Sequence, residues 1–343
     1  MRHRNNEKRR GVQVLRLIHR KVRSMPTPAA GLALGIASIG WGLENALPLH
    51  GIGQNIGALI AAAILLALTV RFIFHPDTLM QDIKHPVVGS IVPTFAMATM
   101  VVSVAVGHYF PRVGQGLWLA AVAVHLIALA LFFFHRAREP RMHHMVPSWF
   151  VPPVGIIVAD VCCPGAAFIP FAQVLLVIGM VSYLIMLPLM IYRFMFCNEV
   201  PDAAKPTIAI MAAPASLSLA GYLTVVQQPS LLICAILLGI ALLMTVVIYC
   251  SFFRLLQLPF SPGYAAFTFP MAIGATALYK MSHLVAQYPG AADYAAQLHL
   301  MATVEVAVAT VIIAYVALRY AHNYWLPGLR LAGKNDTTFN NVA

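Results

Sequence analysis

Long uncharged and apolar runs alternate with short charged turns along most of the chain. Uncharged runs cover 24–43, 45–70, 85–111, 113–135, 142–159, 161–192, 206–253 and 255–279. A helical bilayer crossing needs about 20 consecutive apolar residues, so runs of this length predict membrane spans. The run 206–253 contains the polar turn Gln227-Gln228-Pro229 and therefore predicts two helices.

This pattern predicts ten transmembrane helices. They are expected at 28–46, 52–74, 86–107, 113–135, 148–165, 168–192, 206–226, 230–253, 263–286 and 294–320. The last one carries an acid, Glu305, within its apolar stretch. We number these segments one to ten in chain order.

Composition narrows the class of protein. Of 343 residues, 60% are hydrophobic and only 10% are charged, against roughly a quarter charged in soluble domains. A soluble globular enzyme is therefore excluded, and a multi-pass membrane protein with little extramembrane mass is expected.

The net charge of +11 lies on one side of the predicted topology. Of 22 Lys and Arg residues, only Arg112 and Lys280 fall on the other side, which leaves 20. Positively charged loops remain cytoplasmic, so both termini are predicted on the cytoplasmic side of an inner or plasma membrane. The bilayer itself accounts for the positive charge, and no nucleic acid partner is expected.

Three regions follow from this topology. Residues 1–25 form a basic cytoplasmic N-terminal segment, 26–322 the ten-helix transporter or channel domain, and 323–343 a cytoplasmic tail. Apolar residues within 14–22 leave two alternatives open for the first region, an interfacial amphipathic helix or a disordered basic tail.

The domain repeats with a period near 60 residues. A proline opens each odd-numbered segment, at Pro28, Pro86, Pro147, Pro206 and Pro262. An arginine ends each even-numbered segment, at Arg71, Arg136, Arg193, Arg254 and Arg319. Each repeat is thus a helical hairpin, and all five hairpins face the same way, which places the symmetry axis along the membrane normal.

Prolines inside the odd-numbered segments predict which helices lie inside. They stand at Pro93, Pro152, Pro153, Pro214 and Pro270. A proline frees a backbone carbonyl that lipid cannot satisfy, so these segments are expected to surround a central pore, with the even-numbered helices facing lipid. The predicted fold is an all-α integral membrane protein of five parallel hairpins around a pseudo-fivefold pore. The alternative is that these prolines only pack.

Five short motifs carry a family resemblance. They are Pro26-Thr27-Pro28-Ala29-Ala30-Gly31, His85-Pro86, Pro147-Ser148-Trp149-Phe150-Val151-Pro152, Ala212-Ala213-Pro214-Ala215 and Ala266-Phe267-Thr268-Phe269-Pro270. In this order and spacing the chain resembles the tellurite-resistance and dicarboxylate transporter (TDT) family, which includes TehA-type proteins and plant slow anion channels. The resemblance implies ten helices, a pore lined by the odd-numbered helices and a homotrimer with one pore per subunit.

The resemblance also implies a pore gate at Phe269, just before Pro270, with Phe267 as a weaker candidate. An aromatic ring across a narrow apolar channel blocks water and ions, and one rotamer change could open it. Ordinary packing of both aromatic rings is the alternative. Residues expected to line or kink the pore are Gly35, Pro93, Phe150, Pro152, Pro214, Thr268 and Pro270.

The sign of the transported ion follows from charge and helix direction. Odd-numbered helices start on the cytoplasmic side, so their positive ends and the basic loops face the same mouth. The odd-numbered segments lack the ring of acids that a cation filter needs. Anion passage, as efflux, is predicted. The resemblance allows C4-dicarboxylate, sulfite, tellurite-type oxyanions, chloride or nitrate.

Three charged residues lie within predicted spans: Asp160, Lys280 and Glu305. In a functional interpretation an acid carries protons for a proton-coupled dicarboxylate carrier, and Lys280 attracts anions. In a structural interpretation they pair with one another or with His125, His283 or His299, or they reach the membrane interface. A membrane-embedded redox enzyme is disfavoured because the acids are scattered, and no catalytic residue, cofactor, metal or haem site is predicted.

Overall fold

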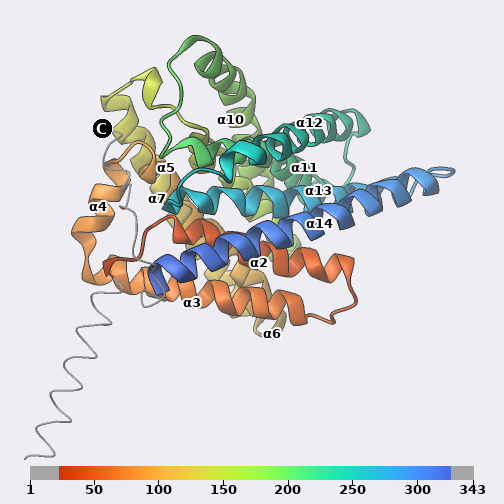
Figure 1. Ribbon diagram of the computed structural model, residues 1–343. Coiled ribbons are helices and arrows are strands. Elements are labelled where there is room, and N and C mark those ends of the chain that lie inside the picture. Colours follow the sequence, from red (N-terminus) through yellow and green to blue (C-terminus); the bar gives the residue numbers. More distant parts are fainter. Residues whose placement is uncertain (1–22, 326–343) are drawn as a thin grey trace, which may run out of the picture.

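The computed structural model describes residues 23–325, and within this range the chain forms helices and no strands. The long helices run roughly side by side (Figure 1). Most of the predicted N-terminal segment 1–25 and of the predicted tail 323–343 lies outside the described residues.

The even-numbered segments are continuous α-helices. They are α3 (Ile52–Phe74), α7 (Pro111–Arg138), α10 (Ile169–Phe196), α12 (Leu231–Leu255) and α14 (Ala292–Tyr320). A short π-helical turn, η7 (Ala321–Trp325), continues α14. Their mostly apolar residues let nearly all backbone groups within these helices bond internally, as lipid requires; the exception is Pro188 inside α10, which has no N–H to donate.

Four of the five odd-numbered segments are broken. The first is one helix, α2 (Ala29–Ala46). The third is α5 (Val88–Ile91) and α6 (Thr94–Tyr109), and the fifth is η2 (Pro147–Phe150), α8 (Val151–Val154), η3 (Gly155–Ile157) and α9 (Val158–Val161). The seventh is η5 (Lys205–Ala212) and α11 (Ala213–Val225), and the ninth is η6 (Pro262–Phe267) and α13 (Phe269–Val285).

Proline explains where these segments break. Pro93 caps α6, and Pro214 and Pro270 lie in the first turns of α11 and α13. Proline has no N–H and clashes with the preceding turn, so it begins a helix more easily than it continues one. The preceding residues take short 3₁₀ turns, as η5 and η6 do.

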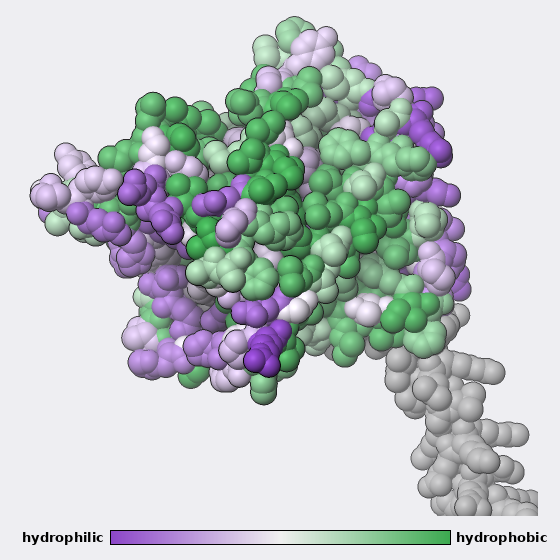
Figure 2. Space-filling view, turned by 180° about the vertical axis from the view of Figure 1, so that it is seen from behind, coloured by the Kyte–Doolittle hydropathy of each residue, from purple (hydrophilic) through white to green (hydrophobic). Residues whose placement is uncertain are grey.

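Burial separates the two sets of segments. In the most apolar stretches of 88–109 and 205–225, 78% and 83% of residues are buried, against 28% to 39% in the five continuous helices. The prediction that odd-numbered segments lie inside and even-numbered helices outside is therefore confirmed for these segments. The face shown in Figure 2 is broadly hydrophobic, with hydrophilic residues gathered toward its edges, as expected for a multi-pass membrane protein.

Length and composition identify seven candidate membrane spans among the described residues. They are 52–74, 88–109, 111–138, 166–196, 205–225, 231–255 and 292–324. The first, fifth and ninth predicted segments are not among them, because they are shorter or interrupted by polar and glycine residues. The ten-crossing arrangement therefore remains a prediction.

The inner segments form a closed sequence of neighbours. Helix α2 packs against α6 and α13, α11 packs against α13 and α9, and α9 packs against α6. Each of these helices thus touches two others of the same set, while α3, α7, α10, α12 and α14 pack from outside.

A short helix, α4 (Pro76–Lys84), fills the link between the second and third segments. No helix is assigned to this link in the sequence analysis. Pro76 at the first helical position and Asp77 in the first turn are typical of a helix start. The helix is half-exposed and amphipathic, and its Ile83 side chain is buried.

Candidate functional site

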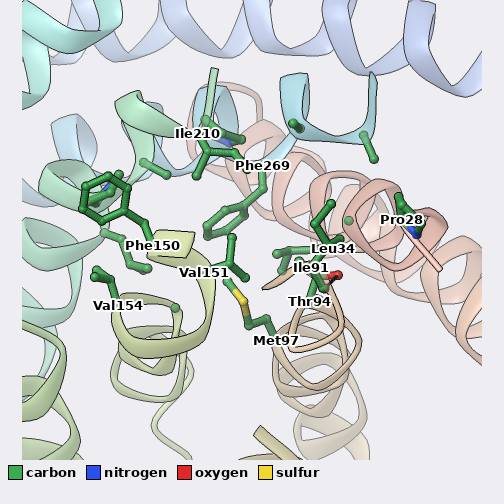
Figure 3. Close-up of a pocket in the computed structure, with 18 of the residues that line it drawn as sticks. Pro28, Leu34, Ile91, Thr94, Met97, Phe150, Val151, Val154, Ile210 and Phe269 are labelled. Atoms are coloured by element: carbon green, nitrogen blue, oxygen red, sulfur yellow. Dashed lines mark hydrogen bonds between the residues drawn. The ribbon is translucent and has the colours of Figure 1, made fainter. Parts of the chain in front are cut away.

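A cavity lies where the inner segments meet. Its volume is about 60 Å³, which is large enough to hold water, since a single molecule needs at least about 15 Å³. The wall residues come from all five inner segments (Figure 3): Pro28, Gly31, Leu34, Ile91, Thr94, Met97, Phe150, Val151, Val154, Gly155, Ile210, Ala213, Pro214, Leu217, Gly263, Ala265, Ala266, Phe269 and Pro270. One cavity is thus built from equivalent parts of five repeats.

The cavity wall is almost entirely apolar. Thr94 supplies the one hydroxyl among the lining residues, and none of them is charged. Small residues such as Gly31, Ala213 and Ala266 also contribute to this wall. The wall therefore offers an occupant almost no polar group and no fixed charge.

Phe269 lies between this cavity and a second one. Its ring faces Val151 at the centre of the cavity (Figure 3), and its side chain is 8% exposed. It also lines a smaller cavity of about 10 Å³, together with Ser38, Trp41, Val101, Val158, Val161, Cys162, Ile273 and Thr276. Phe269 is therefore the residue that the walls of the two cavities share.

Phe267 lies outside both cavities. Its ring is fully buried and packs against Phe252 and Tyr264, with centroid separations of 5.4 and 4.9 Å. Of the two aromatic candidates, the structure brings only Phe269 to the cavities.

The other predicted pore residues divide into two groups. Phe150, Pro214 and Pro270 line the main cavity. Gly35, Pro93, Pro152 and Thr268 do not line either cavity and serve the packing behind them.

Gly35 allows α2 to approach the start of the ninth segment closely. A Cβ added to Gly35 would lie 2.4 Å from the Thr268 Cβ. The buried Thr268 hydroxyl lies 3.1 Å from the Gly31 carbonyl oxygen and 2.7 Å from that of Ala265, and it can donate to either. These contacts fix the helix that carries Phe269.

His125 of α7 supports the broken fifth segment. Its Nε2 atom is 2.8 Å from the Pro152 carbonyl oxygen, and both groups are buried. This bond satisfies backbone in a segment where helix types change. His125 was an alternative partner for the buried acids, and the structure gives it Pro152 instead.

Asp160 lies on α9 and is fully buried. Neither of its carboxylate oxygens has a hydrogen-bond partner. Ion pairs among residues 23–325 are those of Asp82 with Arg71 and of Lys205 with its two acidic neighbours. The predicted alternative of an Asp160–Lys280 pair is therefore absent from the described part of the chain.

Glu305 reaches from α14 to the backbone of α13. Its side chain is nearly buried, and its Oε1 atom has no hydrogen-bond partner. A Cβ added to Gly274 would lie 2.1 Å from that oxygen. The carboxyl group thus occupies the space that a side chain at Gly274 would take, on the helix that carries Phe269.

Glu44, which sequence reasoning did not single out, stabilises the first hairpin turn. Its carboxylate accepts hydrogen bonds from the backbone N–H groups of Gly51, Gly53 and Gln54, at 2.9, 2.6 and 3.2 Å. These groups are at the start of α3, where N–H groups lack helical partners. The sequence does contain a signal for this role, which is an acidic residue a few positions before a glycine-rich helix start.

The arginines that end the repeats hold the two ends of a hairpin together. They lie at the end of the molecule where the even-numbered helices finish, which we call the basic end. Arg71, Arg136 and Arg193 are buried. Each donates to a residue just before the opening proline of its own repeat: to the Thr27 hydroxyl at 2.6 Å, the Lys84 carbonyl at 2.5 Å and the His143 carbonyl at 3.3 Å. The sequence shows the repeating arginines but not these partners.

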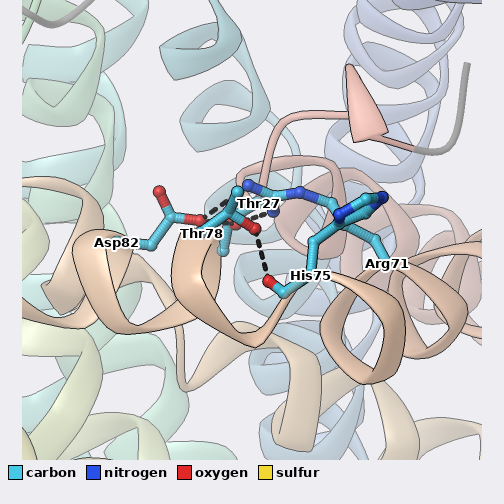
Figure 4. Close-up of polar contacts among 5 residues, drawn as sticks. All are labelled: Thr27, Arg71, His75, Thr78 and Asp82. Carbon is cyan, nitrogen blue, oxygen red and sulfur yellow. Dashed lines mark hydrogen bonds and ion pairs between the residues drawn. The ribbon is translucent and has the colours of Figure 1, made fainter. Parts of the chain in front are cut away.

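The first of these closures also anchors α4 (Figure 4). Arg71 contacts the Asp82 carboxylate at 3.0 Å, and the Thr27 hydroxyl donates to the same oxygen at 2.6 Å. Thr78 turns the chain into α4 by donating to the His75 carbonyl at 2.8 Å. The guanidinium group is therefore held by structure and is not free to attract ions.

The sequence predicts 20 Lys and Arg residues on the cytoplasmic side, but fewer of them can form an exposed positive surface in the described part of the chain. Ten of the 20 lie outside residues 23–325, and three of the other ten are the buried arginines. Burial, reinforced by His143 and Arg136, lowers the pKa of His144 below its usual value, so this imidazole adds little positive charge at pH 7.

Comparison with known proteins places most of the chain in one family. Residues 28–321 match the SLAC1 family, described as voltage-dependent anion channel. Two curated uncharacterized transporters of Methanocaldococcus jannaschii are also similar. One is 27% identical over 243 residues, covering 63% of this chain and 68% of the relative. The other is 25% identical over 244 residues, covering 63% and 70%.

Proposed function

Because the chain belongs to the SLAC1 family of voltage-dependent anion channels, we propose that it passes small anions through the cavity lined by its five inner segments. The observation that carries this proposal is the composition of the cavity wall, to which every repeat contributes. A cavity at the common centre of five repeats is the expected position of a pore.

The proposed architecture has ten crossings in five hairpins around this pore. The closed sequence of neighbours formed by α2, α6, α9, α11 and α13 supports it, as does the greater burial of the inner segments. A homotrimer, expected from the resemblance to the TDT family, is part of the proposal.

Phe269 is the proposed gate. Its ring lines both cavities, so an ion moving from one to the other has to pass it. An apolar constriction excludes ions by excluding water. Rotation of this one side chain would join the two spaces.

Anions are favoured over cations by the direction of the helices. The inner segments begin at the basic end, so their positively polarised ends face that mouth, and no lining residue of either cavity is an acid. We propose that the basic end is cytoplasmic and that the protein mediates efflux across an inner or plasma membrane.

Cavity size orders the candidate anions. A cavity of about 60 Å³ favours compact anions such as chloride, nitrate or sulfite over an extended C4-dicarboxylate. Tellurite-type oxyanions fall between these two groups in size.

A proton-coupled carrier is the second candidate. Asp160 and Glu305 are buried carboxyl groups, and three of their four oxygens lack a hydrogen-bond partner. An acid in this state is costly to charge and suits a site that gains and loses a proton.

Flux through reconstituted protein tests both candidates. Liposomes containing the protein would be loaded in turn with chloride, nitrate, sulfite or succinate, and release would be followed with and without a pH gradient. We expect release of the small anions, with a reversal potential set by the anion gradient. A reversal potential that follows the cation gradient would refute anion passage, and flux independent of the pH gradient would refute proton coupling.

A further inference from the structure

One face of α13 continues beyond the gate. Phe269, Ile273 and Thr276 line the cavities. The same spacing of three and four residues continues to Lys280 and His283 on α13 and to Gln287 in the turn after it. These three residues line a wide vestibule at the end opposite the basic end. Residues at this spacing share one helix face, so the gate and the vestibule are connected along a single stripe.

Lys280 is the first residue of this stripe beyond the small cavity. It is 11 residues after Phe269, about 16 Å at 1.5 Å per residue. Its Nζ atom is 5.7 Å from the centre of the Trp41 ring, and Trp41 lines the small cavity. The ammonium group therefore stands between the small cavity and the vestibule.

Neighbours of Lys280 come from several inner segments. Trp41 belongs to α2, and Leu223 and Val226, which share the vestibule with Lys280, come from α11 and its end. Cys162, at the end of the fifth segment, also lies near the ammonium group. Contacts with segments on both sides of α13 and with the fifth segment indicate that Lys280 faces the common centre and not lipid.

The charge of Lys280 is not neutralised by a carboxylate. None of the ion pairs among residues 23–325 includes it. The vestibule measures about 520 Å³, and its wall contains no acid. Gln227, Gln228 and Gln287 add amide groups to this wall, which can donate hydrogen bonds. One half-buried cation among neutral donors is suited to binding an anion.

We propose that Lys280 forms an anion-binding site at the mouth opposite the basic end, which takes the permeating anion between the vestibule and the small cavity. This inference rests on the proposed function, because it assigns a second site to the same pathway. The ligand is a small anion whose acceptor atoms meet the ammonium group and the glutamine amides. The alternative is that the Lys280 stem and ammonium only pack on Trp41.

Current measurements with chloride on either side of a planar bilayer test the site. A unit charge at about 4 Å in water is worth roughly a fivefold change in binding. Two neutral variants, Lys280→Gln and Lys280→Met, are expected to raise the half-saturating chloride concentration on the vestibule side about fivefold. The methionine variant keeps an unbranched stem on Trp41. Chloride applied at the basic end should show a smaller change, and Lys280→Arg should retain wild-type behaviour.

Arg112→Gln is the matched control, because Arg112 is the other basic residue predicted at this end and is exposed, outside the vestibule wall. It is expected to leave the half-saturating concentration unchanged. Two outcomes would overturn the inference: an equal shift of the half-saturating chloride concentration in Arg112→Gln, or no shift in either neutral Lys280 variant. In both cases anion conduction by the wild type would still support the proposed function. Absence of anion current in the wild type would instead refute the proposed function. Loss of current in both neutral variants, with conduction by Lys280→Arg, would show that the charge is required.

Discussion

Removing the Phe269 ring is expected to raise chloride flux by about 10- to 100-fold. In the proposed gate the ring stands between the cavities of about 60 and 10 Å³ that Phe269 lines, so an anion passing it would shed water against an apolar wall. Desolvating an ion inside a protein costs several kcal/mol, and each 1.4 kcal/mol changes a rate about tenfold. In Phe269→Ala, water would connect the cavities and relieve about 1.4 to 2.8 kcal/mol of this barrier.

Two matched variants separate gating from a simple gain of space. Phe150→Ala enlarges the main cavity but leaves the boundary with the small cavity intact, because Phe150 lines only the main cavity. Phe267→Ala removes an identical ring two residues away, where it packs against Phe252. Both are expected to keep flux within about twofold of wild type, which is a barrier change below about 0.5 kcal/mol.

The assay is chloride release from proteoliposomes at a fixed membrane potential. Truncating a buried phenylalanine costs about 3 to 5 kcal/mol in soluble cores, so thermal unfolding of each purified variant is measured first. Equal flux in wild type and a folded Phe269→Ala would refute the gate. A similar rise in Phe150→Ala would show that cavity volume, and not the ring between the cavities, limits passage.

Three further predictions concern packing, hairpin closure and coupling. Gly35→Ala places a Cβ 2.4 Å from the Thr268 Cβ and should lower stability by about 1 to 3 kcal/mol, so an unchanged Tm would contradict the close approach. Arg71→Gln leaves the Asp82 carboxylate without its ion pair and should cost about 1 to 3 kcal/mol, measured as a lower Tm; a wild-type Tm would remove the closure role. Asp160→Asn removes a carboxyl group that could carry a proton and should abolish any acceleration of anion flux by a pH gradient. If the acceleration is retained, Asp160 is not the group that couples protons to the anion.

Broken inner segments could be predicted from the sequence because proline acts locally. Pro93 and Pro270 have no N–H wherever they stand, and the structure begins α6 and α13 beside them. The continuous apolar helices were equally accessible, since their length and composition alone predict them. The family resemblance, based on five short motifs, is confirmed by the match over residues 28–321.

The choice between Phe267 and Phe269 shows where local reasoning ends. Residues two apart do not share a helix face, so only one of them could face the cavity, and periodicity does not say which. Family resemblance favoured Phe269, and the structure places that side chain at the cavities. Its role as a gate remains a prediction.

Side-chain partners distant in sequence were not predictable at all. Repeating arginines were visible, but the bond of Arg136 to the Lys84 carbonyl joins residues 52 apart and depends on how the hairpin folds back. The state of Asp160 is a similar case. Pairing with Lys280 was a reasonable expectation, and only the packing shows that both oxygens lack a partner.

The arginine closures have a consequence for the order in which the protein can assemble. Those of Arg71, Arg136 and Arg193 join residues 44, 52 and 50 positions apart, so each forms as soon as its own hairpin has left the ribosome. The bond between Thr268 and the Gly31 carbonyl spans 237 positions and must wait for the ninth segment. Local contacts form before distant ones, so hairpins can mature singly during synthesis. The main cavity itself is complete only after the last repeat joins the first.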